Sequence, residues 1–173
     1  RAAGENVTTG TLNTFLGGLA GDATTVGQRN VALGYSALSA DRQGSRSVAI
    51  GAFALVNQNF GDSTNVYNTA VGYDAGVSVT TGETNTLIGG NAGANLTTGD
   101  GNVIIGYVAG SHNIALATGD NNVIIGGLAD TTATDTTGAN VIGRNVSGEG
   151  GYTTLGSGAD DIRAAHGNIT WAT

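Results

Sequence analysis

Groups able to act as nucleophiles, acids or bases are sparse in this sequence, and the densest set lies near its C-terminus. Ser157, Asp160, Asp161 and His166 have the residue types of a catalytic triad. A triad is defined by geometry, however, and an irregular tail provides no scaffold to hold these side chains together. The chain has no Cys, no Gly-x-Ser-x-Gly motif and no phosphate-binding loop between a strand and a helix. We therefore predict that the protein is not an enzyme.

Metal ligation is the next chemistry to consider, and the candidate ligands are isolated. His112 has no second His or Cys at ligand spacing. Asp100 and Asp120 follow matching Thr-Gly pairs, but the Gly-Gly-x-Gly-x-Asp repeat of calcium-binding solenoids is absent. An Asp in a turn usually caps its own backbone. We expect no metal and no cofactor.

The C-terminal segment has a composition suited to recognition. Aromatic faces can stack on a ligand, and charged groups can orient it. We predict a receptor-binding tip formed by Tyr152, Asp160, Asp161, Arg163, His166 and Trp171. The alternative is that Trp171 and Ile169 close the end of a hydrophobic core.

A second recognition candidate lies in the middle of the chain. Phe60 and Tyr67 flank a polar segment that contains Asp62 and Asn65. This composition suits stacking on a sugar and hydrogen bonding to it. Phe60, Asp62 and Tyr67 are therefore candidate receptor contacts, with a merely tolerated loop as the alternative.

These residues must be positioned by a repeat that runs through most of the chain. Its clearest copy is Gly99–Gly110, and its core is Asn, Val or Thr, two apolar residues and a closing Gly. The closing glycines are Gly17, Gly34, Gly51, Gly72, Gly89, Gly106, Gly126 and Gly143, so the successive steps are 17, 17, 21, 17, 17, 20 and 17 residues. A fixed period of this kind is the signature of a solenoid. The two longer steps place extra residues at 61–67 and 111–117, and such insertions emerge as loops, often on a binding face.

Two further columns of residues keep the same register. Alanines follow the closing glycine by three residues, at Ala20, Ala37, Ala54, Ala75, Ala92, Ala109 and Ala129. Glycines precede it by seven residues, at Gly10, Gly27, Gly44, Gly82, Gly99 and Gly119. Two glycines per coil predict two tight turns, where Gly provides backbone angles that are unfavourable for other residues, with short strands between them. A flexible Gly-rich linker, the alternative, would show neither fixed spacing nor apolar columns.

The predicted strand of each coil is apolar on both faces. Because side chains alternate, its first and third residues share one face and its middle residue takes the other. A strand of this kind is buried on both faces. One face can pack inside the coil, and the other needs a partner, most simply further copies of the chain in a homotrimer. We assign core and trimer packing to Val48, Ile50, Val71, Ile88, Val103, Ile104, Ile105, Val123, Ile124 and Ile125; which face meets the trimer axis stays open.

Two smaller groups are expected on the surface. Three tyrosines each follow a closing glycine and should share one edge of the stack, as a glycan platform or as aromatic cover over the turn: Tyr35, Tyr73 and Tyr107. Three arginines cluster beside Asp41, a pattern typical of a solvated turn with surface ion pairs: Arg29, Arg42 and Arg46.

Composition agrees with a thin all-β fold. The 173 residues include 31 Gly, no Pro and 5% aromatic residues, which is too few large side chains for a wide core. Six Arg against 13 acidic residues give a net charge of −7, which argues against a nucleic-acid or anionic-membrane binder. The chain starts at Arg1 rather than Met, which indicates a fragment or a processed product. We predict a parallel β-solenoid, or β-roll, of about eight coils of about 17 residues over 1–143, and an atypical C-terminal cap or tip over 144–173.

The repeat resembles that of a known family. Ser47-Val48-Ala49-Ile50-Gly51, followed by Ala54, is similar to the head repeat of trimeric autotransporter adhesins, the YadA-like head. The resemblance covers about residues 10–143 and implies a left-handed parallel β-roll, three copies of which associate about an axis. The period is longer here than in that family.

The tail carries a second resemblance. The segment from Asp161 to Thr173 is similar to the one that precedes the self-cleaving intramolecular chaperone of phage tail fibres and endosialidase-like spikes. That chaperone trimerises the fibre and then cuts itself off, so the resemblance implies that Thr173 ends a mature product.

Together these observations predict the distal part of a homotrimeric phage tail fibre in the virion. Its partners would be a host cell-surface receptor, either a glycan or an outer-membrane component, and proximal fibre or virion proteins, but no nucleic acid. The head of a bacterial trimeric surface adhesin, on the bacterial cell surface, is the alternative. A polysaccharide-degrading tailspike is a third, since carboxylates for glycoside cleavage could be assembled across coils.

Overall fold

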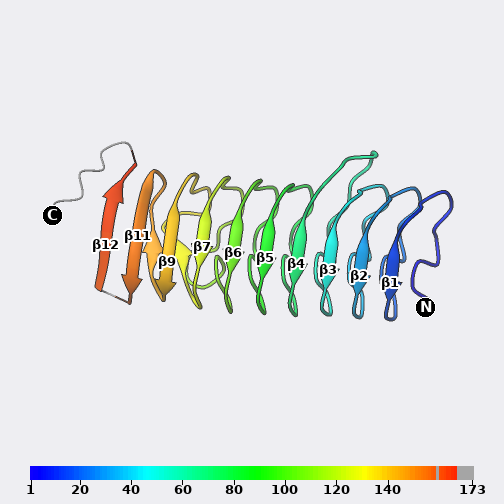
Figure 1. Ribbon diagram of the computed structural model, residues 1–173, viewed down its shortest axis with the longest axis horizontal. Helices are drawn as coiled ribbons and strands as arrows, with labels where there is room; N and C mark the ends of the chain where they lie inside the picture. Colours follow the sequence, from blue (N-terminus) through cyan, green and yellow to red (C-terminus); the bar gives the residue numbers. More distant parts are fainter. Residues whose placement is uncertain (159, 167–173) are drawn as a thin grey trace.

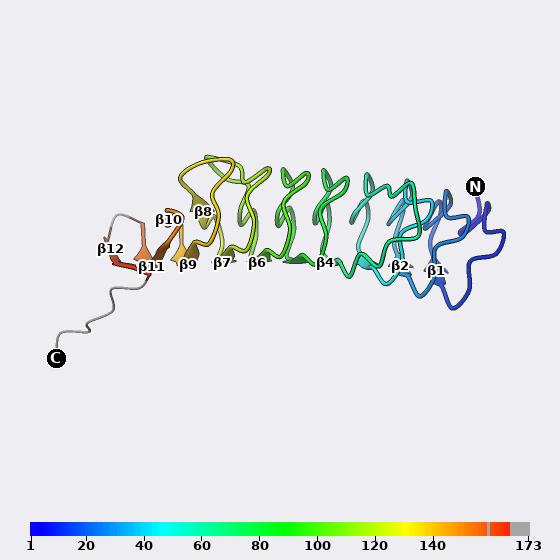
Figure 2. The same cartoon turned by 90° about the horizontal axis from the view of Figure 1, so that it is seen from above.

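The protein is an all-β solenoid in which each coil contributes one short strand to a common sheet. The computed structural model describes residues 1–158 and 160–166, and this part of the chain contains no helix. The coils stack side by side from the N-terminal to the C-terminal end (Figure 1). The strands lie along one side of the stack and most of the connecting segments along the other (Figure 2). The predicted fold class, a parallel β-solenoid with coils of about 17 residues, is confirmed.

The main sheet has ten strands in the order β1-β2-β3-β4-β5-β6-β7-β9-β11-β12. The first seven strands have three residues each: β1 Thr14–Leu16, β2 Val31–Leu33, β3 Val48–Ile50, β4 Thr69–Val71, β5 Thr86–Ile88, β6 Val103–Ile105 and β7 Val123–Ile125. The later strands are β9 Asn140–Arg144, β11 Tyr152–Ser157 and β12 Asp160–Ala165. All neighbours pair in parallel except β11 and β12, which are antiparallel. A small second sheet pairs β8 Asp130–Thr131 with β10 Ser147–Gly148.

Strand pairing reproduces the register predicted from the repeat. Val48 pairs with Thr69 across the 21-residue step, and Val103 pairs with Val123 across the 20-residue step. The extra residues therefore lie outside the strands, and the loop between β3 and β4 projects beyond the neighbouring turns (Figure 1). The last parallel coil is shorter, since Gly143 pairs with Gly156.

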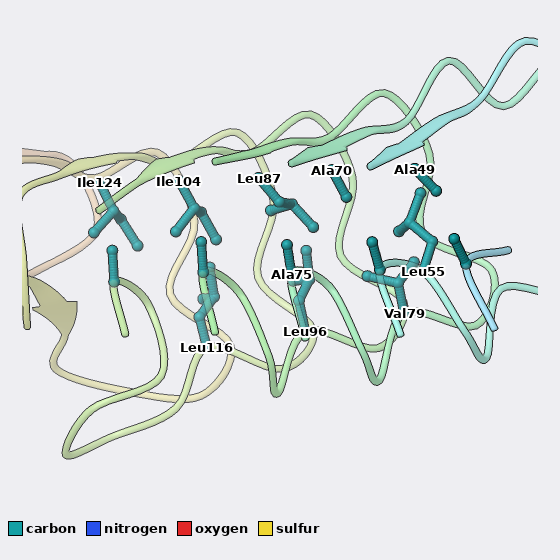
Figure 3. Packing of buried hydrophobic residues seen from close by; sticks show 14 of the residues in the cluster. Ala49, Leu55, Ala70, Ala75, Val79, Leu87, Leu96, Ile104, Leu116 and Ile124 are labelled. Carbon is teal, nitrogen blue, oxygen red and sulfur yellow. The ribbon is translucent and has the colours of Figure 1, made fainter. Parts of the chain in front are cut away.

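In the three-residue strands β1 to β7 the middle residue points into the coil and contributes to the hydrophobic core. Ala32, Ala49, Leu87, Ile104 and Ile124 occupy this position and are fully buried. They face the column of alanines that follows each closing glycine by three residues (Figure 3). Because the coil is thin, these two columns and a few Leu and Val side chains fill its interior.

Side-chain volume is conserved within a coil by paired changes. Where the middle strand residue is Ala49, the residue six positions later is the buried Leu55. Where the middle residue is Leu87, that position is Gly93, and a Cβ there would lie 2.8 Å from the Leu87 side chain. In the fourth coil both positions are small, Ala70 and Gly76, and Leu55 and Leu87 of the neighbouring coils fill the space: a Cβ on Gly76 would lie 3.0 Å and 2.6 Å from them.

The two predicted glycine columns have different physical causes. The closing Gly89 has φ +129, and a Cβ on it would lie 2.5 Å from the Gly106 carbonyl oxygen of the next coil. Gly82, in the other column, has no positive φ; its Cβ would lie 2.5 Å from the Gly99 carbonyl oxygen. The prediction that both glycines provide unusual backbone angles is therefore wrong for the second column, which requires only close approach between coils.

A ladder of buried asparagines joins the coils. The Asn102 side chain donates to the Gly119 carbonyl oxygen at 2.9 Å, and its Oδ1 accepts the backbone N–H of Asn122 at 3.0 Å. Asn85 does the same one coil earlier, accepting the Asn102 N–H at 2.9 Å. Each amide thus satisfies one backbone donor and one backbone acceptor that would otherwise be buried without a partner.

We expect Asn102→Ala to lower the free energy of unfolding by about 1–3 kcal/mol, because it leaves the Asn122 N–H and the Gly119 carbonyl unpaired in the interior. Urea denaturation at a fixed protein concentration measures the change. Asn95→Ala, at an exposed Asn, is the matched control and should change stability by less than about 0.5 kcal/mol. Equal losses in the two variants would contradict a special role for the ladder.

Candidate interaction surface

The outward face of the main sheet consists of two columns of side chains, one from each strand residue that flanks the middle position. We call it the outer face. Its first column is Thr14, Val31, Val48, Thr69, Thr86, Val103, Val123, Asn140, Thr153 and Ala164. Its second column is Leu16, Leu33, Ile50, Val71, Ile88, Ile105, Ile125, Ile142, Leu155 and Ile162.

The second column is aliphatic in all ten strands, and neither column contains a charged residue. Ile50, Ile88 and Ile142 are 36%, 38% and 42% exposed in the single chain, and Leu16 and Ile162 are each 68% exposed. At about 4.8 Å per strand, ten strands give a strip about 43 Å long. Monomeric soluble proteins rarely expose a contiguous apolar strip of this extent.

The residues predicted to pack in the core or between copies divide between two faces. Ile104 and Ile124 point inward and are fully buried. The others lie on the outer face: Val48, Ile50, Val71, Ile88, Val103, Ile105, Val123 and Ile125. The interior is thus closed within one chain, whereas the outer face is covered only in part.

The aliphatic column continues where the sequence repeat has decayed. Leu155 pairs with Ile142, and Ile162 pairs with Leu155 across the antiparallel end of the sheet. Sequence reasoning did not place Ile162 on this face, because β12 runs against the direction of the repeat. An aliphatic residue directly before a closing Gly, Leu155 before Gly156 as Ile142 before Gly143, was the available signal for Leu155.

The three tyrosines that follow closing glycines lie on one edge of the outer face. Tyr35, Tyr73 and Tyr107 are 53%, 58% and 67% exposed. Phe53 lies between the first two, with ring-centroid distances of 5.5 Å to Tyr35 and 6.1 Å to Tyr73 in edge-to-face geometry. This contact partly covers the turns while leaving the rings accessible.

The structure separates the residues that were predicted to form a site at the 61–67 insertion. Phe60 is only 6% exposed, so its ring is not available for stacking on a ligand. Asp62 is exposed and accepts a hydrogen bond from the Thr64 hydroxyl at 2.5 Å. Tyr67 is 51% exposed, and the Arg46 guanidinium lies 5.4 Å from its ring centroid.

Asp41 does not form the predicted ion pairs with the nearby arginines. It is buried and accepts hydrogen bonds from the Gly44 N–H at 2.9 Å, the Phe60 N–H at 3.2 Å and the Gln58 amide at 2.5 Å. Burial raises the pKa of Asp41 above its ordinary value, and these hydrogen bonds partly oppose the shift. Among the described residues, Arg29, Arg42 and Arg46 have no carboxylate partner.

Gln58 replaces the missing member of the asparagine ladder. The third coil has Ser47 at the ladder position. The Gln58 amide, fully buried, donates to the Ser47 hydroxyl at 3.0 Å, and its carbonyl accepts from Asn68 at 2.9 Å. The ladder therefore continues through the coil that carries the insertion.

Each insertion is fixed by hydrogen bonds from its backbone to a buried aspartate of a neighbouring coil. Asp41 accepts the N–H of Phe60 at the base of 61–67. Asp130 accepts the N–H of Asn113 at 2.7 Å and that of Ile114 at 3.0 Å within 111–117. Burial raises the pKa of Asp130 as well, with the same backbone hydrogen bonds opposing it.

Two residues of the predicted tip close the C-terminal end of the stack. Arg163 contacts Asp161 at 3.1 Å, Glu149 at 3.5 Å and the Ser147 carbonyl oxygen at 3.3 Å. Asp161 and Arg163 share one face of β12, and Ile162 between them lies on the outer face. Tyr152 is 37% exposed at the start of β11.

His166 completes this end of the outer face rather than a triad. Its Nε2 lies 3.1 Å from the Asn140 amide and 3.1 Å from the Thr153 hydroxyl, and no contact with Ser157 is found among the described residues. Asp160 is in β12, and its side chain lies outside the described part of the structure. Trp171 and Ile169 also lie outside the described residues.

The acidic turns bind the backbone of neighbouring coils. Asp100 accepts the Glu83 N–H at 2.7 Å, and Asp120 accepts the Asp100 N–H at 2.8 Å. The expectation that each caps its own turn is therefore wrong. Over residues 1–158 and 160–166 no group of three His, Cys, Asp or Glu residues could hold a metal ion.

The described surface has no pocket, and within it no helix is long and apolar enough to cross a membrane. Comparison with family models, with curated proteins and with solved structures gives no match. The outer face, the edges beside it and the insertions are thus the candidate functional surfaces.

The buried Asp41 predicts a pH dependence of stability. Because its folded-state pKa lies above the ordinary value of 3.8, the folded protein keeps this proton where the unfolded chain has lost it. The stabilisation from this group is complete below pH 3.8 and is lost as the pH rises through the folded-state pKa. The melting temperature of wild type minus that of Asp41→Asn should therefore fall as the pH rises. A difference that is constant or rises with pH would contradict this assignment; Asp130 is common to both proteins and cancels.

Proposed function

We propose that the chain is a segment of a homotrimeric fibre that attaches a virion to a host cell surface. The observation that carries the proposal is the aliphatic column of the outer face, uninterrupted through ten strands. The resemblance of the repeat to the heads of trimeric adhesins supports three copies about a common axis.

Further copies of the same chain suit the outer face better than an unrelated partner. An identical copy presents the same column with the same spacing of about 4.8 Å, so side chains can interdigitate along the whole strip. The chain has a net charge of −7, but neither column of the outer face contains a charged residue. Contact between two outer faces therefore buries no charged side chain from these columns. The aliphatic column continues through β11 and β12, as an interface along the whole sheet requires.

A stiff stack of coils suits attachment at a distance from a larger assembly. Three copies in each fibre, and several fibres in each virion, make binding multivalent, so weak individual contacts can add up to firm attachment. The proposed partners are a cell-surface glycan or outer-membrane component at one end and proximal fibre or virion proteins at the other. The head of a bacterial surface adhesin is the second candidate, because it would use the same repeat and the same trimer.

Ile88→Asp should abolish assembly but leave the coil folded, because Ile88 is on the outer face and 38% exposed in the single chain. Sedimentation should give a trimer for wild type and a monomer for the variant, with strand-type circular dichroism in both. Thr98→Asp, an exposed position away from the strands, is the matched control and should remain a trimer.

Ile104→Asp tests the opposite face and should prevent folding, because it places an unpaired charge in the closed interior. A wild-type protein that is monomeric at micromolar concentration would overturn the trimer. A wild-type trimer that binds no cell in a panel of Gram-negative and Gram-positive bacteria would overturn attachment while leaving assembly intact.

A further inference from the structure

One row of residues lies at the corner of the coil directly before the ladder position, and we call it the corner row. Its eight members all have positive φ: Leu12, Arg29, Arg46, Tyr67, Thr84, Gly101, Asn121 and Gly138. Strand register places them on successive coils. The backbone of this corner is therefore the same in every coil, while the side chains differ.

The choice of residues in the corner row opposes the backbone preference in coils two to four. Left-handed backbone favours Gly and Asn, which occupy the row in the last three of these coils as Gly101, Asn121 and Gly138. Arg29, Arg46 and Tyr67 instead have φ values of +57, +68 and +57, and all three are exposed. Leu12 and Thr84 show that this corner also accepts other side chains, and the exposure of Arg29, Arg46 and Tyr67 leaves them accessible to a ligand.

The 61–67 insertion orients one of these side chains. Asn65 accepts a hydrogen bond from Arg46 Nε at 2.8 Å, and the Arg46 guanidinium lies 5.4 Å from the Tyr67 ring centroid. Ser45 and Asn65 form an isolated parallel bridge that fixes this part of the loop. The insertion thus delivers both an amide and an aromatic ring to the same guanidinium.

Arg29 provides a second arginine in the corner row, on the coil next to that of Arg46. It occupies the equivalent position one coil away, about 4.8 Å along the stack. Neither arginine has a carboxylate partner among the described residues. An anion that lies between arginines on adjacent coils can accept hydrogen bonds from both, and guanidinium is the group best suited to bind a carboxylate through paired hydrogen bonds.

We propose that Arg29, Arg46 and Tyr67 bind an acidic sugar unit of a surface glycan. The sugar carboxylate accepts hydrogen bonds from the two guanidinium groups, and the apolar face of the sugar ring packs on the exposed part of Tyr67. The net charge of −7 repels an acidic polymer overall, so binding must come from this local pair of charges. The inference rests on the proposed attachment function and places its receptor contact on the side of the fibre.

The test uses the assembled protein and oligosaccharides of galacturonate, glucuronate and sialic acid, each paired with its carboxyl-reduced neutral form. Calorimetry or fluorescence anisotropy should show tighter binding to at least one acidic oligomer than to its neutral form. Arg46→Gln, Arg29→Gln and Tyr67→Leu should each weaken that binding about tenfold or more. Leu is compatible with this backbone, since Leu12 occupies the same position in the first coil.

Arg42→Gln is the matched control, because it removes the same charge from an exposed arginine outside the corner row. It should bind like wild type, and all four variants should keep the trimer and its melting temperature. No preference for any acidic oligomer, or equal weakening by Arg42→Gln, overturns the site. Loss of the trimer in the corner-row variants overturns it too, by assigning these residues to the interface.

The result also separates this inference from the proposed function. Unchanged attachment of the Arg46→Gln and Tyr67→Leu trimers to a cell that wild type binds overturns the corner-row site but leaves the fibre function standing. Absence of wild-type attachment to every cell tested, with intact binding to an acidic oligomer, overturns the fibre function and leaves the site.

Discussion

Pairing of buried backbone N–H and C=O groups with the neighbouring coil is the constraint on which this structure depends. A coil that contributes a single three-residue strand cannot satisfy its backbone internally. The asparagine ladder supplies the missing partners, because each amide donates to one backbone carbonyl and accepts one backbone N–H. Successive coils are therefore held at one spacing, and residue types are repeated by column rather than by local structure.

The same constraint governs how the stack accommodates irregular coils. The coil with Ser47 in the ladder regains an amide from Gln58, and Asp41 holds the base of the insertion that follows. Asp130 holds the second insertion in the same way. Burying a carboxylate is unfavourable unless it is hydrogen-bonded, so each of these aspartates is surrounded by donors. Extra residues are thereby confined outside the sheet, and strand register is kept.

The alternation of side chains in each strand separates stability from interaction. The middle position is enclosed by the coil and serves folding, whereas its two neighbours form an outer face that one chain covers only in part. The corners on either side of that face tolerate variation, because only their backbone angles are repeated. Aromatic and basic side chains collect there, at the tyrosine edge and in the corner row.

Residue spacing in the sequence was sufficient to predict the solenoid, its period and the strand register, because the ladder and the close approach of coils require the same residue types at each turn. It also indicated that both faces of the strand are apolar. Tertiary structure was needed to show that Ile104 points inward and Ile105 outward, that Phe60 is buried, and that Asp41 pairs with Gln58 instead of an arginine. The contact of Arg46 with Tyr67 and the antiparallel β12 also emerged only there. These features join residues from different coils without a shared period, so their partners are set by the three-dimensional stacking and leave no regular pattern along the chain.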